Sequence, residues 1–182
     1  MLPKLLGLTG RKRSGKDTAA EALGGEVVTF AYPMKLMLGA LLRYQGASTD
    51  LVERMLNGDL KETPSPLLGG HTPRFAMQRL GTEWGRTQMG EDFWVSIALN
   101  RVEELDPPRA IIPDVRFPNE AAAIRARGGE VWRVRRPNRP AGVGDEHSSE
   151  VLIDTLDVER EITNDQATAE EFQAELHRLV VQ

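Results

Sequence analysis

The sequence has 182 residues, of which 40% are hydrophobic, with a net charge of −4 and no cysteine. This length predicts a single domain over residues 1–182, and the acidic balance disfavours a nucleic-acid-binding protein. Without cysteine, disulfides and thiolate metal sites are excluded. No apolar run approaches the roughly 20 residues of a membrane span, and the apolar stretch near the N-terminus is short for a signal peptide. We therefore expect a soluble, cytoplasmic protein.

The first predicted elements are a strand and a helix that enclose a glycine-rich loop. The strand lies over 5–8, and the helix lies over 17–23 and ends at a glycine pair. Between them, Gly10, Gly15 and Lys16 have the G-x4-G-K spacing of a phosphate-binding loop, in which Lys16 would reach the β- and γ-phosphates. Asp17 stands where Ser or Thr is usual, and Thr18 follows. The alternative is an ordinary turn with basic residues.

The rest of the chain alternates between strand and helix patterns. We expect strands over 26–31, 109–115, 130–136 and 158–163, and helices over 32–44, 50–56, 72–89, 92–105, 119–127 and 168–181. Loops are expected over 61–71 and 137–144. This order predicts an α/β protein with a mostly parallel sheet covered by helices on both faces, whose ligands bind beyond the carboxyl ends of the strands. The loops at Gly10, Asp114 and Asn164 should gather there.

Three groups of polar residues are further candidates for chemistry. Arg79 and Arg86 are seven apart on one predicted helix that begins near Arg74, and could bind an acceptor phosphate; the alternative is a solvated face with partners such as Glu83. Asp114, Arg116 and Glu120 follow an apolar strand, where an acidic residue often contacts magnesium; the alternative is a helix cap. Arg133, Arg135, Arg136 and Arg139 lie just before or within a predicted lid over 136–150. They could neutralise charge on a transferring phosphoryl group, or could protect an edge strand.

The chain resembles the bacteriophage-encoded deoxynucleoside monophosphate kinases, within the phosphate-loop nucleotide kinase superfamily. The matching motifs, in family order, are K-R-S-G-K-D-T (12–18), Q-R-L-G-T-E-W-G-R (78–86), E-D-F-W (91–94), D-V-R-F-P-N-E (114–120) and D-E-H-S-S-E (145–150). Residues 46–70 carry no matching motif. The resemblance implies a three-layer P-loop NTPase fold with a small lid and acceptor-binding region.

The resemblance also implies roles for residues at the matching positions. The residues that would bind ATP are Arg13, Ser14, Gly15, Lys16, Asp17 and Thr18, and Mg²⁺ would be bound either by the carboxylate of Asp17 or by Thr18 in its place. The acceptor nucleotide would contact Lys12, Arg74, Arg79, Gly81, Thr82, Trp94, Asp114, Arg116 and Glu120. Apart from the resemblance, the charge that phosphoryl transfer must neutralise makes Lys16, Arg116 and Arg135 the expected catalytic residues. Residues 162–165 are similar to the end of the last strand in nucleotide kinases, where the chain passes the adenine.

The resemblance implies transfer of the γ-phosphoryl group of ATP to a deoxynucleoside monophosphate, in the host cytoplasm if the protein is phage-encoded. The partners would be small nucleotides, without a membrane or nucleic acid, and a homodimer is left open. One alternative is a kinase of another phosphorylated small molecule, such as dephospho-coenzyme A or phosphomevalonate. Another is an ATP-binding switch without phosphoryl transfer. The expected acceptor motifs favour the nucleotide kinase.

Overall fold

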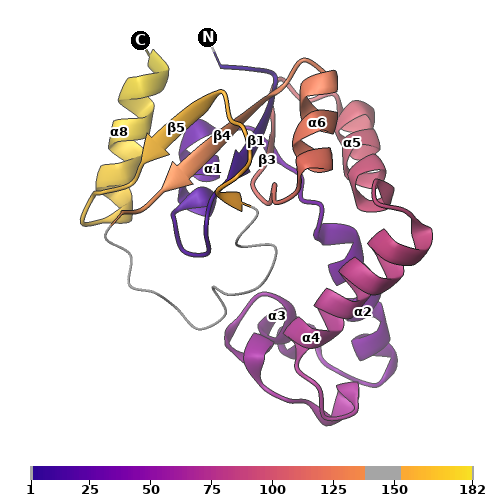
Figure 1. Ribbon diagram of the computed structural model, residues 1–182. Coiled ribbons are helices and arrows are strands. Elements are labelled where there is room, and N and C mark those ends of the chain that lie inside the picture. The colour runs from indigo at the N-terminus through magenta and orange to yellow at the C-terminus, as the bar shows by residue number, and fades with distance from the viewer. Residues whose placement is uncertain (1, 138–152, 182) are drawn as a thin grey trace. The chain divides into compact units, whose positions relative to one another are not determined.

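The computed structural model describes residues 2–137 and 153–181. The chain forms two compact units (Figure 1). The first, which we call the sheet unit, comprises Met1–Phe30 and Ala98–Gln182. The second, which we call the helical unit, comprises Ala31–Ile97. Among the described residues, no helix is both long and apolar enough to span a membrane.

The sheet unit is built on a five-stranded parallel sheet in the order β2-β3-β1-β4-β5. This arrangement confirms the predicted α/β class and places β1, which leads into the glycine-rich loop, at the centre of the sheet. The strands are β1 (Leu5–Thr9), β2 (Glu26–Val27), β3 (Ala110–Ile112), β4 (Glu130–Arg135) and β5 (Arg160–Thr163).

Helices cover both faces of this sheet. Successive side chains of β1 point to opposite faces, and each face packs against helices. Leu6 and Leu8 are fully buried in a cluster with residues of α1 (Lys16–Leu23) and α8 (Ala169–Val181). On the opposite face, a side chain added at Gly7 would collide with Ile124 of α6 (Pro118–Ala126), so glycine permits α6 to pack closely. Helix, sheet and helix form the three layers.

The helical unit has its own apolar core, made by Leu38, Leu42, Val52, Met55, Leu56 and Met77. Its helices are α2 (Tyr32–Tyr44), α3 (Thr49–Leu56), α4 (Pro73–Gln78), the π-helix η3 (Arg79–Met89) and the beginning of α5 (Phe93–Leu105). The predicted loop over 61–71 contains the end of one short 3₁₀ turn, η1 (Asp59–Glu62), and all of another, η2 (Pro66–Leu68).

Two sequence predictions about these elements need correction. The strand predicted over 26–31 is only two residues long, because beyond Val28 the backbone N–H of Phe30 donates to the Asp114 carboxylate, at 3.1 Å, instead of to the sheet. The helix predicted over 72–89 changes from α to π geometry at Arg79. In a π-helix residues five apart are hydrogen-bonded, so Arg79 and Arg86 do not share a face as α-helical spacing predicted.

Candidate functional site

The glycine-rich loop joins the end of β1 to the start of α1 and has a backbone that requires its glycines. Gly10, Arg13 and Gly15 adopt positive φ angles of 147°, 63° and 103°. A side chain at Gly10 would lie 2.3 Å from the carbonyl oxygen of Val134. Gly15 is the N-cap of α1, so no capping side chain accepts from the first-turn N–H groups. The geometry is that of an anion-binding loop at a helix N-terminus.

Lys16 lies across this loop. Its ammonium donates to the backbone oxygens of Gly10, at 2.6 Å, and Arg11, at 2.9 Å. Two hydroxyls also lie buried at the loop, on Thr9 and Ser14, and neither has a hydrogen-bond partner within residues 2–137 and 153–181. The loop therefore brings a cation and the N-terminus of α1 to one edge of the sheet, where they can attract a phosphate.

Asp17 and Thr18 lie in the first turn of α1, directly after Lys16, where they place two oxygen-bearing side chains beside the loop. Asp17 is exposed and Thr18 is half-buried. Oxygen atoms are the ligands that Mg²⁺ prefers, and this ion commonly takes only one or two protein ligands and keeps several waters. Within the described part of the chain, no cluster of three or more His, Cys, Asp or Glu residues forms a larger metal cage.

The junction after β3 lies at the same edge of the sheet, because β3 is adjacent to β1 and Val115 N–H donates to Leu8 O at 3.2 Å. Glu120 is buried there, and its Oε2 accepts from the backbone N–H groups of Arg116, at 2.6 Å, and Phe117, at 3.0 Å. Glu120 thus shapes the turn that carries Arg116. Asp114, which holds Phe30 N–H, similarly fixes the end of β2.

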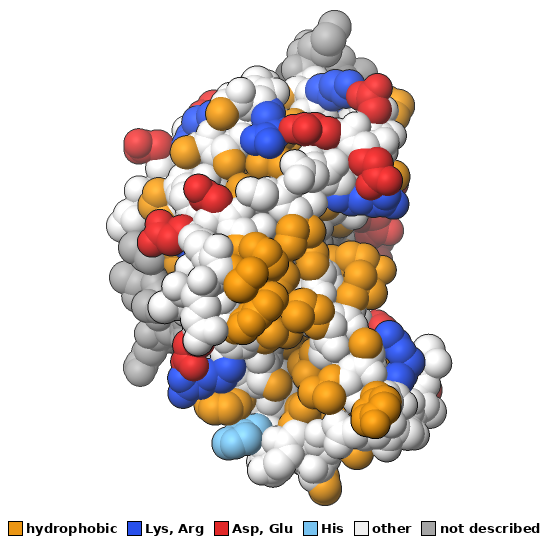
Figure 2. Space-filling view, turned by 90° about the vertical axis from the view of Figure 1, so that its right-hand side faces the viewer, with side chains coloured by type: hydrophobic (Ala, Val, Ile, Leu, Met, Phe, Trp, Pro, Cys, Tyr) orange, Lys and Arg blue, Asp and Glu red, His pale blue; other side chains and the backbone are white. Residues whose placement is uncertain are grey.

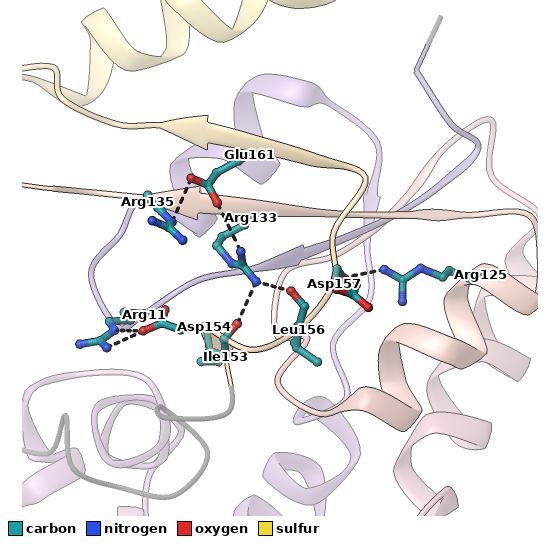
Figure 3. A network of polar contacts seen from close by, with 9 residues as sticks. All are labelled: Arg11, Arg125, Arg133, Arg135, Ile153, Asp154, Leu156, Asp157 and Glu161. Carbon is teal, nitrogen blue, oxygen red and sulfur yellow. Dashed lines mark hydrogen bonds and ion pairs between the residues drawn. The ribbon is translucent and has the colours of Figure 1, made fainter.

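The arginines of β4 differ in their surroundings (Figure 3). Arg133 is 6% exposed, and its guanidinium donates to the backbone oxygens of Ile153 and Leu156 and pairs with Glu161 at 3.3 Å. Arg135 is half-exposed and pairs with the same carboxylate at 3.0 Å. The sequence missed the buried role of Arg133, although the alternation of β4 offered a signal by placing it on the same face as buried Val131.

Arg11 of the phosphate loop joins this network by an ion pair with Asp154, in which its Nε donates at 3.0 Å. Lys12 is half-buried in the same loop, and Arg13 is exposed. The remaining predicted lid features, Arg139 and residues 145–150, lie outside the described residues.

The other predicted acceptor residues lie in the helical unit. Trp94 is buried, and its indole N–H donates to the backbone oxygen of Gly81 at 2.9 Å, so two of these residues meet in one contact. Arg74 pairs with Glu62. Arg79 pairs with Glu83, so this side chain has the intrahelical partner that the alternative of a solvated face predicts. Thr82 is exposed on η3.

Comparisons with known proteins identify the family of the chain. A model of the family described as deoxynucleotide monophosphate kinase matches residues 70–175. A relative from Acanthamoeba polyphaga mimivirus, whose name proposes a deoxynucleotide monophosphate kinase, is 30% identical over 190 positions that cover 94% of this chain and 93% of the relative. The deoxynucleoside-5′-monophosphate kinase of Escherichia phage T5 is 43% identical over 54 residues, which are 30% of this chain and 22% of that protein.

The crystal structure of TT1252 from Thermus thermophilus is similar in fold, with a TM-score of 0.50 over all of this chain and 97% of that one. At 16% identity this similarity concerns the fold alone. The family model covers more than half of the chain, and the mimivirus relative matches along nearly its whole length. Together with the phosphate loop, these matches show that the chain belongs to the deoxynucleotide monophosphate kinase family.

Proposed function

We propose that this kinase transfers the γ-phosphoryl group of ATP to the 5′-phosphate of a deoxynucleoside monophosphate, which gives the diphosphate and ADP. Family membership supports the acceptor class. The observation that carries the proposal is the ammonium of Lys16, which lies across the phosphate loop, within 2.9 Å of two loop carbonyl oxygens, at the N-terminus of α1. A cation in this position suits the triphosphate of the donor.

In the proposed reaction an oxygen of the acceptor phosphate attacks the γ-phosphorus of ATP, and the bond from the γ-phosphorus to the bridging oxygen breaks. The acceptor is already ionised at neutral pH, so no general base is required. Catalysis then consists of holding the two nucleotides in line and neutralising charge on the phosphoryl group. Lys16, Arg116 and Arg135 are the proposed sources of positive charge.

The proposed ATP site is the loop itself, with the backbone of Gly15 and the side chains of Arg13, Ser14, Lys16, Asp17 and Thr18. The oxygens of Asp17 and Thr18 fit Mg²⁺, which when bound would neutralise part of the phosphate charge. In the sheet unit, the residues proposed to bind the acceptor are Lys12, Asp114, Arg116 and Glu120. In the helical unit, they are Arg74, Arg79, Gly81, Thr82 and Trp94. Because Glu120 holds the backbone of Arg116, we expect it to act on the acceptor through Arg116.

The test is ADP formation from Mg-ATP with each of the four common deoxynucleoside monophosphates, their ribose counterparts, dephospho-coenzyme A and phosphomevalonate. Turnover on one or more deoxynucleotides supports the proposal and identifies the base. Turnover on another acceptor alone would support ATP as the phosphoryl donor but would show that the acceptor is not a deoxynucleotide. ATP binding without turnover on any acceptor would favour a nucleotide-binding switch instead.

Lys16→Ala is expected to lower kcat at least 100-fold, because it removes a preorganised charge at the transferring group. Lys4→Ala is the matched control. Lys4 immediately precedes β1, at the end of the strand opposite to the phosphate loop, and forms an exposed ion pair with Asp106. Full activity of folded Lys16→Ala would contradict the mechanism.

A further inference from the structure

A buried amide lies against the phosphate loop from the end of β5. Asn164 directly follows β5 and is 6% exposed. Its backbone N–H donates to Arg135 O at 2.6 Å, and its side-chain Nδ2 donates to Ser14 O at 2.9 Å. The residue is thus fixed on one side to β4, and its amide reaches across 150 positions of sequence to the loop.

The loop is shaped to receive this amide. A side chain at Gly15 would place its Cβ 2.4 Å from Nδ2 of Asn164 and 3.3 Å from Cε1 of Phe172. The amide therefore fills space that only glycine leaves open, and the phenyl ring of α8 lies beside it. Asn164 restrains the loop both by a hydrogen bond and by close packing.

The hydrogen bond acts on a particular peptide group. The acceptor is the carbonyl of Ser14, and the N–H of the same planar peptide belongs to Gly15. In a trans peptide the carbonyl and the N–H point in opposite directions, so a partner that holds Ser14 O also sets the direction of the Gly15 N–H. Phosphate loops bind through such N–H groups. One residue later Lys16 begins α1, whose first bond runs from Ala19 N–H to Gly15 O at 2.8 Å.

We propose that Asn164 is a positioning residue of the phosphate loop. It holds the Ser14–Gly15 peptide so that the Gly15 N–H and Lys16 face the phosphates of the donor, and it does not itself contact the nucleotide. The proposal rests on the proposed use of ATP. It differs from the expectation that this strand end serves the adenine, because the side-chain amide is committed to the loop.

The experiment compares Asn164→Ala with the wild-type protein by calorimetric titration with Mg-ATP and with Mg-tripolyphosphate. Loss of one hydrogen bond that orients the loop should weaken both about five- to tenfold, because both ligands use the loop phosphates. Asn164→Asp keeps the shape, removes the donor and adds negative charge, so it should weaken both at least as much. In turnover assays the KM for ATP should rise, and the KM for the acceptor should stay within about twofold. Asn100→Ala, at an exposed position of α5, should match wild type.

Thermal denaturation of each variant first establishes that it is folded. If Asn164→Ala does not fold, Asn164→Asp and Asn164→Ser carry the test. Unchanged ATP affinity in a folded variant would overturn the proposal. So would a loss confined to ATP, which would indicate an adenine contact, or an equal rise in both KM values, which would indicate general distortion. A wild-type protein that binds no ATP would refute the proposed function instead, so the two failures are distinguishable.

Discussion

The guanidinium of Arg133 is a buried cation held largely by backbone oxygens. It donates to the carboxylate of Glu161 on β5 and to the backbone carbonyls of Ile153 and Leu156. Residues 153–156 are the first described residues after position 137. Backbone carbonyls carry partial negative charge and satisfy several guanidinium donors at once. Arg133 therefore joins residues 153–156 to the sheet, beside the ion pair between Arg11 and Asp154 (Figure 3).

We predict that Arg133→Met lowers the free energy of unfolding by about 3 kcal/mol, because it leaves two carbonyl oxygens without this donor. Urea denaturation measures the change. Arg135→Met is the matched control: it removes an exposed partner of the same Glu161 and should cost about 1 kcal/mol or less. Equal losses in the two variants would contradict the structural role of Arg133.

At the scale of elements, the π-helix η3 depends on one close contact. The Trp94 ring lies against Gly85, where an added Cβ would be 2.1 Å from the indole nitrogen, and the indole N–H donates to Gly81 O. Trp84 and Phe93 pack against the same ring, at 5.8 and 4.8 Å between centroids. The contact between a rigid indole and a glycine backbone couples η3 to α5.

Gly85→Ala is expected to destabilise the protein by about 1–3 kcal/mol, because the indole cannot move away without losing its hydrogen bond. The shift in thermal midpoint measures this effect, and near-ultraviolet circular dichroism reports the displaced tryptophan. Gly81→Ala is the control, since its Cβ would meet only the flexible Met34 thioether at 3.1 Å. A larger loss for Gly81→Ala would show that the Trp94 contact is not the constraint.

Glu159, the residue before β5, connects this part of the chain to β4 and α6 by hydrogen bonds. Its carboxylate accepts from Val131 N–H, at 2.6 Å, and from Arg125 Nε, at 2.7 Å. Partial burial alone would raise the pKa of Glu159, but the hydrogen bonds from Arg125 and Val131 and the charge of Arg125 outweigh it and lower the pKa below its ordinary value of 4.5. The native state thus favours the ionised carboxylate.

Because the pKa is lowered on folding, this stabilisation is present above pH 4.5 and is lost as the pH falls through the native value. We predict that Glu159→Gln lowers the urea midpoint at pH 7 and that its difference from wild type shrinks between pH 5 and pH 3. Glu104→Gln, which alters an exposed pair with Arg101, serves as the control. A difference that is constant with pH would exclude an electrostatic role.

At the scale of the whole molecule, the exposed apolar side chains include several on α2, among them Leu36, Met37, Leu41 and Tyr44. Apolar side chains gather on one face of the protein (Figure 2).

Both units contain a buried apolar core of their own. They are joined by the continuous helix α5, whose residues 93–97 belong to the helical unit and whose remainder belongs to the sheet unit.

Because the length of the chain predicts a single domain, we expect the two units to unfold together. Trp132 lies in the sheet unit, while Trp84 and Trp94 lie in the helical unit. In Trp132→Phe, fluorescence reports the helical unit and far-ultraviolet circular dichroism reports all helices, so their urea midpoints should coincide. Separate midpoints would show that the units are independent domains.

The sequence by itself determined the elements that depend on local chain geometry. The strand, glycine loop and helix were recognisable because glycine spacing, apolar runs and the first helical turn lie within about twenty residues. The cap of α8 is equally local: Thr168 and Glu171, three residues apart, exchange hydrogen bonds with each other's backbone. The alternation of strands and helices then predicted the parallel sheet.

Only the tertiary structure decided which polar groups become buried and with what partner. β2 ends early because Asp114 lies 84 residues away from Phe30 in sequence and beside it in space. The loop amide Asn164, the buried Arg133 and the π-geometry of η3 likewise depend on contacts between separate elements. Burial and hydrogen bonding of such groups depend on where the folded sheet brings distant segments together, and local sequence pattern carries little information about that.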